Sequence, residues 1–241
     1  MTCKTGVAKL DRLLGGGVRE GSRVILYGPS FQGKETLGRA VFLAALARGE
    51  PAVMILLNRG VDEVREDLAA ADSKFADYEA KGLVHFVDAY SKSIGIEEER
   101  KDTVYVDSAT DMNAVSLALN QIHAKILKDH EKHVLVLDSV STLVLFGNGQ
   151  ATFRFLQILV GRARQAGATS FLLLDHGMHS DAEVQMFKHL ADGVLMMRED
   201  GGNTQLNIEG LGLSDRPGWI EYKASDTKFD ITGSLAAGRI R

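Results

Sequence analysis

The sequence contains few of the features that mark extracellular or membrane proteins. Its 241 residues include a single cysteine, Cys3, and three prolines. A lone cysteine forms no disulfide within the chain, which excludes a disulfide scaffold and favours a reduced, cytoplasmic setting. No apolar run approaches the roughly 20 residues that a membrane-spanning helix requires, and charged residues interrupt the first 16 positions. We therefore expect neither a secretion signal nor a membrane span.

The charge is nearly balanced and includes no dense basic block. Lys and Arg number 28 against 32 Asp and Glu, which gives a formal net charge of -4 at pH 7. Nucleic-acid-binding domains carry a basic patch or stripe, so we expect no nucleic acid as a partner, although a local basic loop is left open. With 45% hydrophobic residues, a chain of this length can bury one large core. Residues 1–241 are therefore expected to form one domain.

Short apolar runs alternate with helical patterns along most of the chain. Strands are predicted at 24–27, 52–57, 83–88, 134–138, 170–175 and 193–197, and helices at 34–48, 61–71, 111–127, 150–166 and 181–190. This alternation indicates an α/β fold around a mainly parallel sheet flanked by helices. The polar segment 90–106 is expected to be a surface loop.

The last third of the chain has a different pattern. Three short runs at close spacing, 204–208, 219–223 and 228–231, indicate a small antiparallel C-terminal extension of the sheet. Trp219, Tyr222 and Phe229 are expected to pack this extension, and stacking on an adenine base is the alternative role.

Glycine is abundant, with 25 copies, and its most informative cluster follows the first predicted strand. Residues 28–34 read G-x-x-x-x-G-K between a strand and a helix, which is the order of a phosphate-binding loop. Such glycines let backbone N–H groups converge on phosphate oxygens, and the helix N-terminus and a lysine add positive charge. An incidental glycine turn is the alternative. The predicted nucleotide-binding residues are Gly28, Pro29, Ser30, Phe31, Gln32, Gly33, Lys34, Glu35 and Thr36.

Two acidic residues are candidates for holding Mg²⁺. Where the motif normally has a Ser or Thr that coordinates the metal, this chain has Glu35, and a hydroxyl follows only at Thr36. A carboxylate is a hard ligand that suits Mg²⁺, but it repels phosphate oxygens, so Glu35 either binds the metal or excludes it. Asp138 ends an apolar strand, as the metal-holding acid of phosphate-loop NTPases does. Its alternative role is that of a turn or helix-capping residue.

These segments resemble the KaiC-like branch of the RecA superfamily. The resemblance is carried by LDRLLGGG before the first strand, YGPSFQGKET at the loop, LVLDSVSTLV around Asp138, and LLLDHGMHSDAEV and HLADGVLMMRED further on. It implies a RecA-like P-loop NTPase core, ATP with Mg²⁺ as ligand, and self-assembly into a hexamer-like ring, a filament or a dimer with nucleotide at the subunit interfaces. It also places Asp175 and His176 in the region that senses the γ-phosphate.

The chain departs from that family at its catalytic positions. KaiC-like enzymes end the second strand in a pair of glutamates, one of which activates the attacking water, whereas Asn58 and Arg59 stand at the matching positions. The family's Lys-x-Arg-Gly segment, which reaches the phosphate of the adjacent subunit, is replaced by Asn-Ile-Glu-Gly at 207–210. An arginine-finger contact alone is worth about 10³–10⁵ in rate. We therefore assign no catalytic residue and expect ATP binding with weak or absent hydrolysis, in a regulatory or assembly component.

Two other functions stay open at this point. The chain is alternatively a scaffold subunit that keeps the RecA fold without binding nucleotide, or a recombination and repair paralogue that acts on DNA. Gly33 and Lys34 favour nucleotide binding, since a scaffold needs neither residue. A protein partner would meet the polar segment 91–102, unless that segment is only a solvated loop.

Histidines and serines near the strand at 170–175 offer two further interpretations. His176 and His179 are spaced as a compact metal pair, but no helical metal-binding pattern surrounds them, so we interpret them as polar loop residues. A Ser-His-Asp hydrolase built from Ser139 or Ser141 with His176 is set aside, because the sequence has no G-x-S-x-G elbow.

Overall fold

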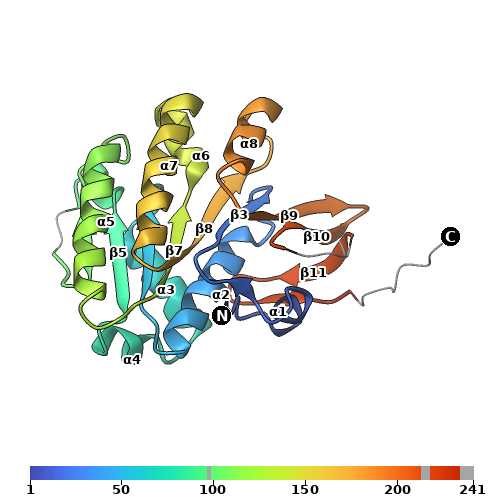
Figure 1. Ribbon diagram of the computed structural model, residues 1–241, viewed down its shortest axis with the longest axis horizontal. Coiled ribbons are helices and arrows are strands. Elements are labelled where there is room, and N and C mark those ends of the chain that lie inside the picture. Colours follow the sequence, from blue (N-terminus) through green and yellow to red (C-terminus); the bar gives the residue numbers. More distant parts are fainter. Residues whose placement is uncertain (97–98, 213–217, 234–241) are drawn as a thin grey trace.

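The computed structural model describes residues 1–96, 99–212 and 218–233, so Glu97 and Glu98 of the candidate partner segment lie outside the described residues. Its centre is a ten-stranded sheet in the order β12-β11-β10-β9-β3-β8-β7-β4-β5-β6 (Figure 1). The strands from β9 to β6 pair in parallel, and β10, β11 and β12 extend the sheet with antiparallel pairs. The strands are β3 (Arg23–Gly28), β4 (Ala52–Leu56), β5 (Val84–Asp88), β6 (Thr103–Tyr105), β7 (His133–Asp138), β8 (Ala168–Asp175), β9 (Gly193–Asp200), β10 (Asn203–Gly210), β11 (Ile220–Ala224) and β12 (Phe229–Ile231).

Helices cover both faces of the parallel strands. In Figure 1, α5, α7 and α8 stand side by side along the sheet, and the antiparallel strands lie at the right-hand end of the view. The helices are α1 (Ala8–Leu13), α2 (Lys34–Ala47), α3 (Val61–Ala71), α4 (Phe75–Ala80), α5 (Met112–Ile126), α6 (Val140–Phe146), α7 (Gly149–Gln165) and α8 (Asp181–Lys188), with a 3₁₀ turn η1 (Ser91–Ile94). The short strands β1 (Thr2–Cys3) and β2 (Val18–Arg19) form a separate two-stranded sheet.

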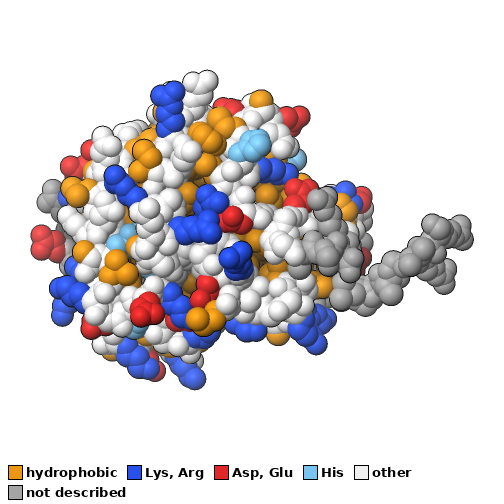
Figure 2. Space-filling model, viewed as in Figure 1, with side chains coloured by type: hydrophobic (Ala, Val, Ile, Leu, Met, Phe, Trp, Pro, Cys, Tyr) orange, Lys and Arg blue, Asp and Glu red, His pale blue; other side chains and the backbone are white. Residues whose placement is uncertain are grey.

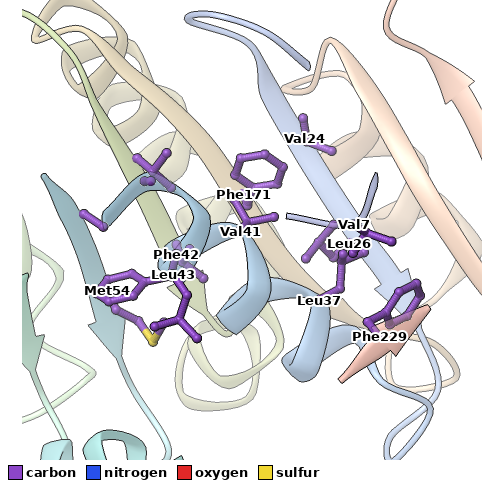
Figure 3. Close-up of a cluster of buried hydrophobic side chains, with 14 of the residues drawn as sticks. Val7, Val24, Leu26, Leu37, Val41, Phe42, Leu43, Met54, Phe171 and Phe229 are labelled. Atoms are coloured by element: carbon purple, nitrogen blue, oxygen red, sulfur yellow. The ribbon is translucent and has the colours of Figure 1, made fainter. Parts of the chain in front are cut away.

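The parallel strands are mostly apolar because each of their faces packs under helices. Successive residues of a strand point to opposite faces, so Val24 and Leu26 of β3 join the core beneath α2, whereas Ile25 and Tyr27 join the core beneath α5 and α7. Figure 3 shows the first of these cores, with side chains of α2 against those of the strands. The packing of α2 on β3 positions the loop that joins them.

Most predicted elements are present, and the α/β class with a mainly parallel sheet is confirmed. The antiparallel extension is also present, and Tyr222 stacks on Phe229 with ring centroids 4.6 Å apart. Trp219 precedes β11 and lies against the guanidinium of Arg198, 4.0 Å from its ring centroid. The aromatic residues therefore pack the extension, as expected.

The prediction of a surface loop at 90–106 is wrong in part. Residues 103–105 form the edge strand β6, which pairs with β5 through Phe86 and Thr103. The strand is only three residues long and follows a polar stretch. It is therefore too short to show the alternation of apolar and polar residues by which strands are predicted. Helices α4 and α6 were likewise not predicted, because six or seven residues show fewer than two helical turns.

Within the described residues, the helices are too short or too polar to span a bilayer. On the face shown in Figure 2, acidic side chains lie among the basic ones. That nucleic acid is not a partner stays a prediction.

Two histidines pack together at the amino edge of the sheet, opposite the loops that follow the strands, and a third acts on one of them through its charge. His133 begins β7 and is 2% exposed, His123 of α5 lies over it with ring centroids 4.9 Å apart, and His85 of β5 is the third member. Burial lowers the pKa of His133 to about 3 and those of His123 and His85 to about 4; repulsion from its two neighbours adds to the effect on His133. The native state therefore holds all three in the neutral form at pH 7.

We predict that this cluster makes the fold sensitive to acid. In the unfolded chain a histidine has a pKa near 6.5, so between about pH 6.5 and 4 the unfolded state binds more protons and the free energy of unfolding falls as the pH falls. His133 alone should contribute about 2 kcal/mol of that loss between pH 7 and pH 5. Denaturant unfolding of wild type and His133→Phe at the two pH values measures the difference. The exposed His189→Asn is the control, and equal pH dependence in all three proteins would contradict the prediction.

Candidate nucleotide-binding site

A cavity of about 980 Å³ opens at the carboxyl edge of the parallel strands. In open α/β sheets this edge is where ligands bind, because the loops that follow the strands converge there. The cavity is bordered by the loop after β3, the ends of β4, β7 and β8, and the turn between β11 and β12. Segments that lie more than 190 residues apart in sequence thus form one site.

The loop between β3 and α2 has the backbone shape that its glycines predict. Gly33 precedes α2 with φ +89°, and a Cβ there would overlap Ala224 of β11, so both the backbone and the packing require glycine. The Tyr222 hydroxyl donates a hydrogen bond to the Gln32 carbonyl at 2.6 Å. The side chain of Phe31 is fully exposed at the tip of the loop, where φ is +63°. The C-terminal hairpin therefore supports the loop directly.

Lys34 is buried, with 1% of its surface exposed, and its two acidic partners border the cavity. Its Nζ contacts Oε1 of Glu35 and Oδ1 of Asp175, each at 2.6 Å. Burial alone would lower its pKa, but the hydrogen bonds and charges of Asp175 and Glu35 outweigh it, and the pKa of Lys34 lies above the ordinary value. The lysine is therefore charged, and the two carboxylates neutralise it.

Asp138, at the end of β7, is a buried carboxylate at the cavity. It is 9% exposed, and no donor from the described part of the chain hydrogen-bonds to its side chain. Burial and the charge of Glu35 raise its pKa to about 6, while the charges of Arg59 and Lys34 act in the opposite direction. A buried carboxylate that none of the described groups satisfies indicates a position suited to a cation or water.

Asp138 and Glu35 fit the oxygen chemistry of Mg²⁺ in part. Both carboxylates border the cavity, and Mg²⁺ is commonly held by one or two carboxylates together with substrate phosphates and water. Among the residues that the structure describes, no group of three or more Asp, Glu, His or Cys side chains is arranged to hold a metal by itself. The phosphate groups would therefore have to complete the coordination.

Thr36 is used for another contact. Its Oγ1 donates to the Ser225 carbonyl at 2.9 Å, in the turn between β11 and β12. Arg39, one turn further along α2, donates to the Asp226 carbonyl at 2.8 Å and pairs with Asp67 of α3 at 3.1 Å. The sequence shows Arg39 only as a helix arginine, and its role in joining α2, α3 and the turn depends on contacts across 187 residues.

The two candidate sensor residues, Asp175 and His176, have different surroundings in the structure. Asp175 lies beside Lys34, and the Ser30 hydroxyl is 3.4 Å from its Oδ1. The ring of His176 instead packs edge-on against Tyr27, with centroids 5.3 Å apart, and does not border the cavity. Only Asp175 is thus placed to respond to a ligand on Lys34.

His179 does not form a metal pair with His176. Its Nε2 lies 2.8 Å from the Ser141 Oγ, which also accepts a hydrogen bond from the Asp175 backbone N–H at 2.8 Å. Ser141 is 1% exposed, so its hydroxyl fixes the end of β8 rather than serving as a nucleophile. The expectation that these are polar loop residues agrees with this arrangement.

Arg59 and Glu209 both form ion pairs, Arg59 with acidic residues and Glu209 with a lysine. Arg59 follows β4, borders the cavity and pairs with Glu63 and Asp67 of α3 at 2.8 and 2.7 Å. Glu209 of β10 pairs with Lys188 at 3.1 Å. An arginine therefore stands at the end of β4, and the 207–210 segment presents an acid where KaiC-like enzymes have cations.

The chain is similar to UPF0273 proteins over most of its length. It is 28% identical over 203 residues to a UPF0273 protein of Methanopyrus kandleri, covering 81% of this chain and 76% of the relative. It is 31% identical over 202 residues to a UPF0273 protein of Aeropyrum pernix, covering 82% and 77%.

The fold has a solved counterpart. A crystal structure of a KaiC-like protein from Pyrococcus horikoshii superposes with a TM-score of 0.74 over 96% of this chain and 98% of that chain, at 20% identity. Residues 3–208 match the ATPase family described as KaiC. The match takes in the phosphate loop, Asp138 and Asp175, and by this match the chain belongs to the KaiC family of ATPases.

Proposed function

We propose that the protein binds ATP at the 28–36 loop, hydrolyses it slowly or not at all, and acts as a regulatory or assembly component. The observation that carries this proposal is the combination of a phosphate loop that keeps Gly33 and Lys34 with an arginine that follows β4. Lys34 is buried and charged, between two acids that border the cavity, and a glycine-rich loop followed by a lysine is the arrangement that binds phosphate groups. Arg59 stands beside Asp138, where a base would have to act.

Binding requires Lys34 to exchange its carboxylate partners for phosphate oxygens. Glu35 and Asp175 now neutralise the lysine, and together with Asp138 they make the empty site unfavourable for a free anion. Mg²⁺ held by Asp138 and Glu35 would offset this repulsion and neutralise charge on the phosphates. The backbone N–H groups of the loop and the N-terminus of α2 supply the remaining attraction.

Hydrolysis is slow in this proposal because, among the described residues, no carboxylate directly follows β4 to activate water, and Asp138 would be engaged by the metal. Asn58 and Arg59 follow β4, and a guanidinium cannot accept a proton from water at neutral pH. Glu63 also borders the cavity, but Arg59 engages its carboxylate at 2.8 Å. The site therefore holds a triphosphate without efficiently activating water.

Titration of wild type with a fluorescent ATP analogue and Mg²⁺ tests the proposal. We expect saturable binding, a loss of about tenfold or more in Lys34→Met, and turnover below about 1 s⁻¹, the lower end of ordinary enzyme rates. Lys132→Ala is the matched control, because Lys132 also pairs with two acids, Glu20 and Glu50, far from the cavity. Thermal unfolding checks that Lys34→Met remains folded. Absence of binding by wild type would leave the scaffold function, and faster turnover that Lys34→Met abolishes would contradict slow hydrolysis.

We predict that Glu35 makes nucleotide binding dependent on the metal. Glu35→Gln keeps the size of the side chain and removes one negative charge next to Lys34, so nucleotide affinity in EDTA should rise about tenfold or more. With Mg²⁺ present the gain should be smaller, since the cation already offsets that charge. Calorimetric titrations with and without Mg²⁺ measure both effects. Weaker binding by Glu35→Gln in EDTA would contradict the repulsive role.

We further propose that a second copy of the chain covers the open side of the site when ATP is bound, in a hexamer-like ring or a dimer. This is supported by exposed apolar side chains around the cavity: Phe31, Leu145, Phe146 and Met178 are 100%, 64%, 62% and 45% exposed. Exposed apolar patches of this kind mark interaction sites.

Mass measurement by light scattering, with and without ATP, tests this assembly. We expect ATP to raise the mass of wild type but not that of Phe146→Asp. Leu117→Asp is the control, since Leu117 is similarly exposed, at 60%, on α5 away from the cavity. If the mass of wild type remains that of a monomer when ATP is present, the proposal is contradicted.

A further inference from the structure

The sheet register brings the end of β4 next to Asp138. Leu56 of β4 is paired with Asp138 of β7, and the Leu57 N–H donates to the Asp138 carbonyl at 2.9 Å. Arg59 follows two residues later, at the start of the connection to α3. Its position beside the phosphate site is thus set by backbone pairing rather than by the choice of a side-chain rotamer.

Arg59 is held in one orientation by α3. Its Nε donates to Glu63 at 2.8 Å and its Nη2 to Asp67 at 2.7 Å, and these acids lie one turn apart on the helix. No acceptor in the described ranges takes a hydrogen bond from its Nη1, and the side chain is 24% exposed where it borders the cavity. The guanidinium therefore retains donors for a ligand in the cavity.

Arg59 and Asp138 border the same two cavities. Together with Glu35 they line the large cavity and a second, small one of about 10 Å³, the space of one water molecule. Glu35 in turn contacts the Lys34 Nζ at 2.6 Å. A phosphate chain bound at Lys34 would thus extend into a cavity that the guanidinium borders.

We propose that Arg59 donates hydrogen bonds to the terminal phosphate of a bound nucleoside triphosphate and makes the site select triphosphates over diphosphates. This inference rests on the proposed function and extends it. A guanidinium donates two parallel hydrogen bonds to a phosphate, and it accepts no proton. Arg59 therefore binds the terminal phosphate and leaves it in place, which suits a protein whose output is the bound state.

Binding measurements on Arg59→Ala test the proposal. Affinities are measured by calorimetry, with Mg²⁺, for ADP and for an ATP analogue with a non-hydrolysable β–γ bridge. We expect the triphosphate to lose about tenfold or more in affinity and ADP less than about twofold, because the diphosphate lacks the group that Arg59 contacts. Arg65→Ala is the matched control: Arg65 lies on α3, is 22% exposed and, like Arg59, pairs with two acids, but these are Glu79 and Asp102, outside the cavity.

Each outcome decides the proposal. Equal affinities of wild type for the two nucleotides, or equal losses in Arg59→Ala, overturn the role of Arg59 and leave the proposed function standing. Absence of any nucleotide binding by wild type overturns both. If Arg59→Ala does not fold, Arg59→Lys answers the same question, since it keeps the charge but loses the two parallel bonds and should lower the selectivity for triphosphate.

Discussion

The site depends on one electrostatic constraint, the buried charge of Lys34. An ammonium group that is 1% exposed is stable only if opposite charges compensate it within the protein. Glu35 supplies one of these from the same helix, and Asp175 supplies the other from the end of β8. Asp175 reaches the lysine because β8 pairs with β3, where Gly28 and Asp175 are register partners. The order of the central strands is therefore a condition for the charge balance of the loop.

The same constraint explains why the neighbouring carboxylate, that of Asp138, does not pair with Lys34. Lys34 has two acidic partners, and Asp138 comes third, buried at the end of the next strand with a pKa raised to about 6. Arg59 adds the second cation, and it borders the same cavity as Asp138 but is itself held by α3. Carboxylates at the site thus exceed cations. In the proposed function, this excess of negative charge is what would make nucleotide binding depend on Mg²⁺.

The sequence predicts those features whose residues are close together in the chain. The strand 24–27, the loop 28–34 and the helix from Lys34 follow from residues adjacent in the chain, and the structure contains all three. The edge strand β6 is not predicted, because three residues are too few to show the alternation of apolar and polar side chains that marks a strand. The contacts of Thr36 with Ser225 and of Arg39 with Asp226 join segments 187 to 189 residues apart. No spacing rule connects such segments, so their partners become visible only in the fold.

The C-terminal extension is part of the site for the same reason. Tyr222 holds the Gln32 carbonyl, Ala224 packs on Gly33, and Phe229 stacks on Tyr222 behind them. On the other side, β9 pairs directly with β3 and carries β10, which in turn carries β11. The phosphate loop is therefore fixed both by the strand that leads into it and by a hairpin that returns to it. A movement of this loop would therefore also move the hairpin, so the antiparallel strands connect the loop to the outer edge of the sheet.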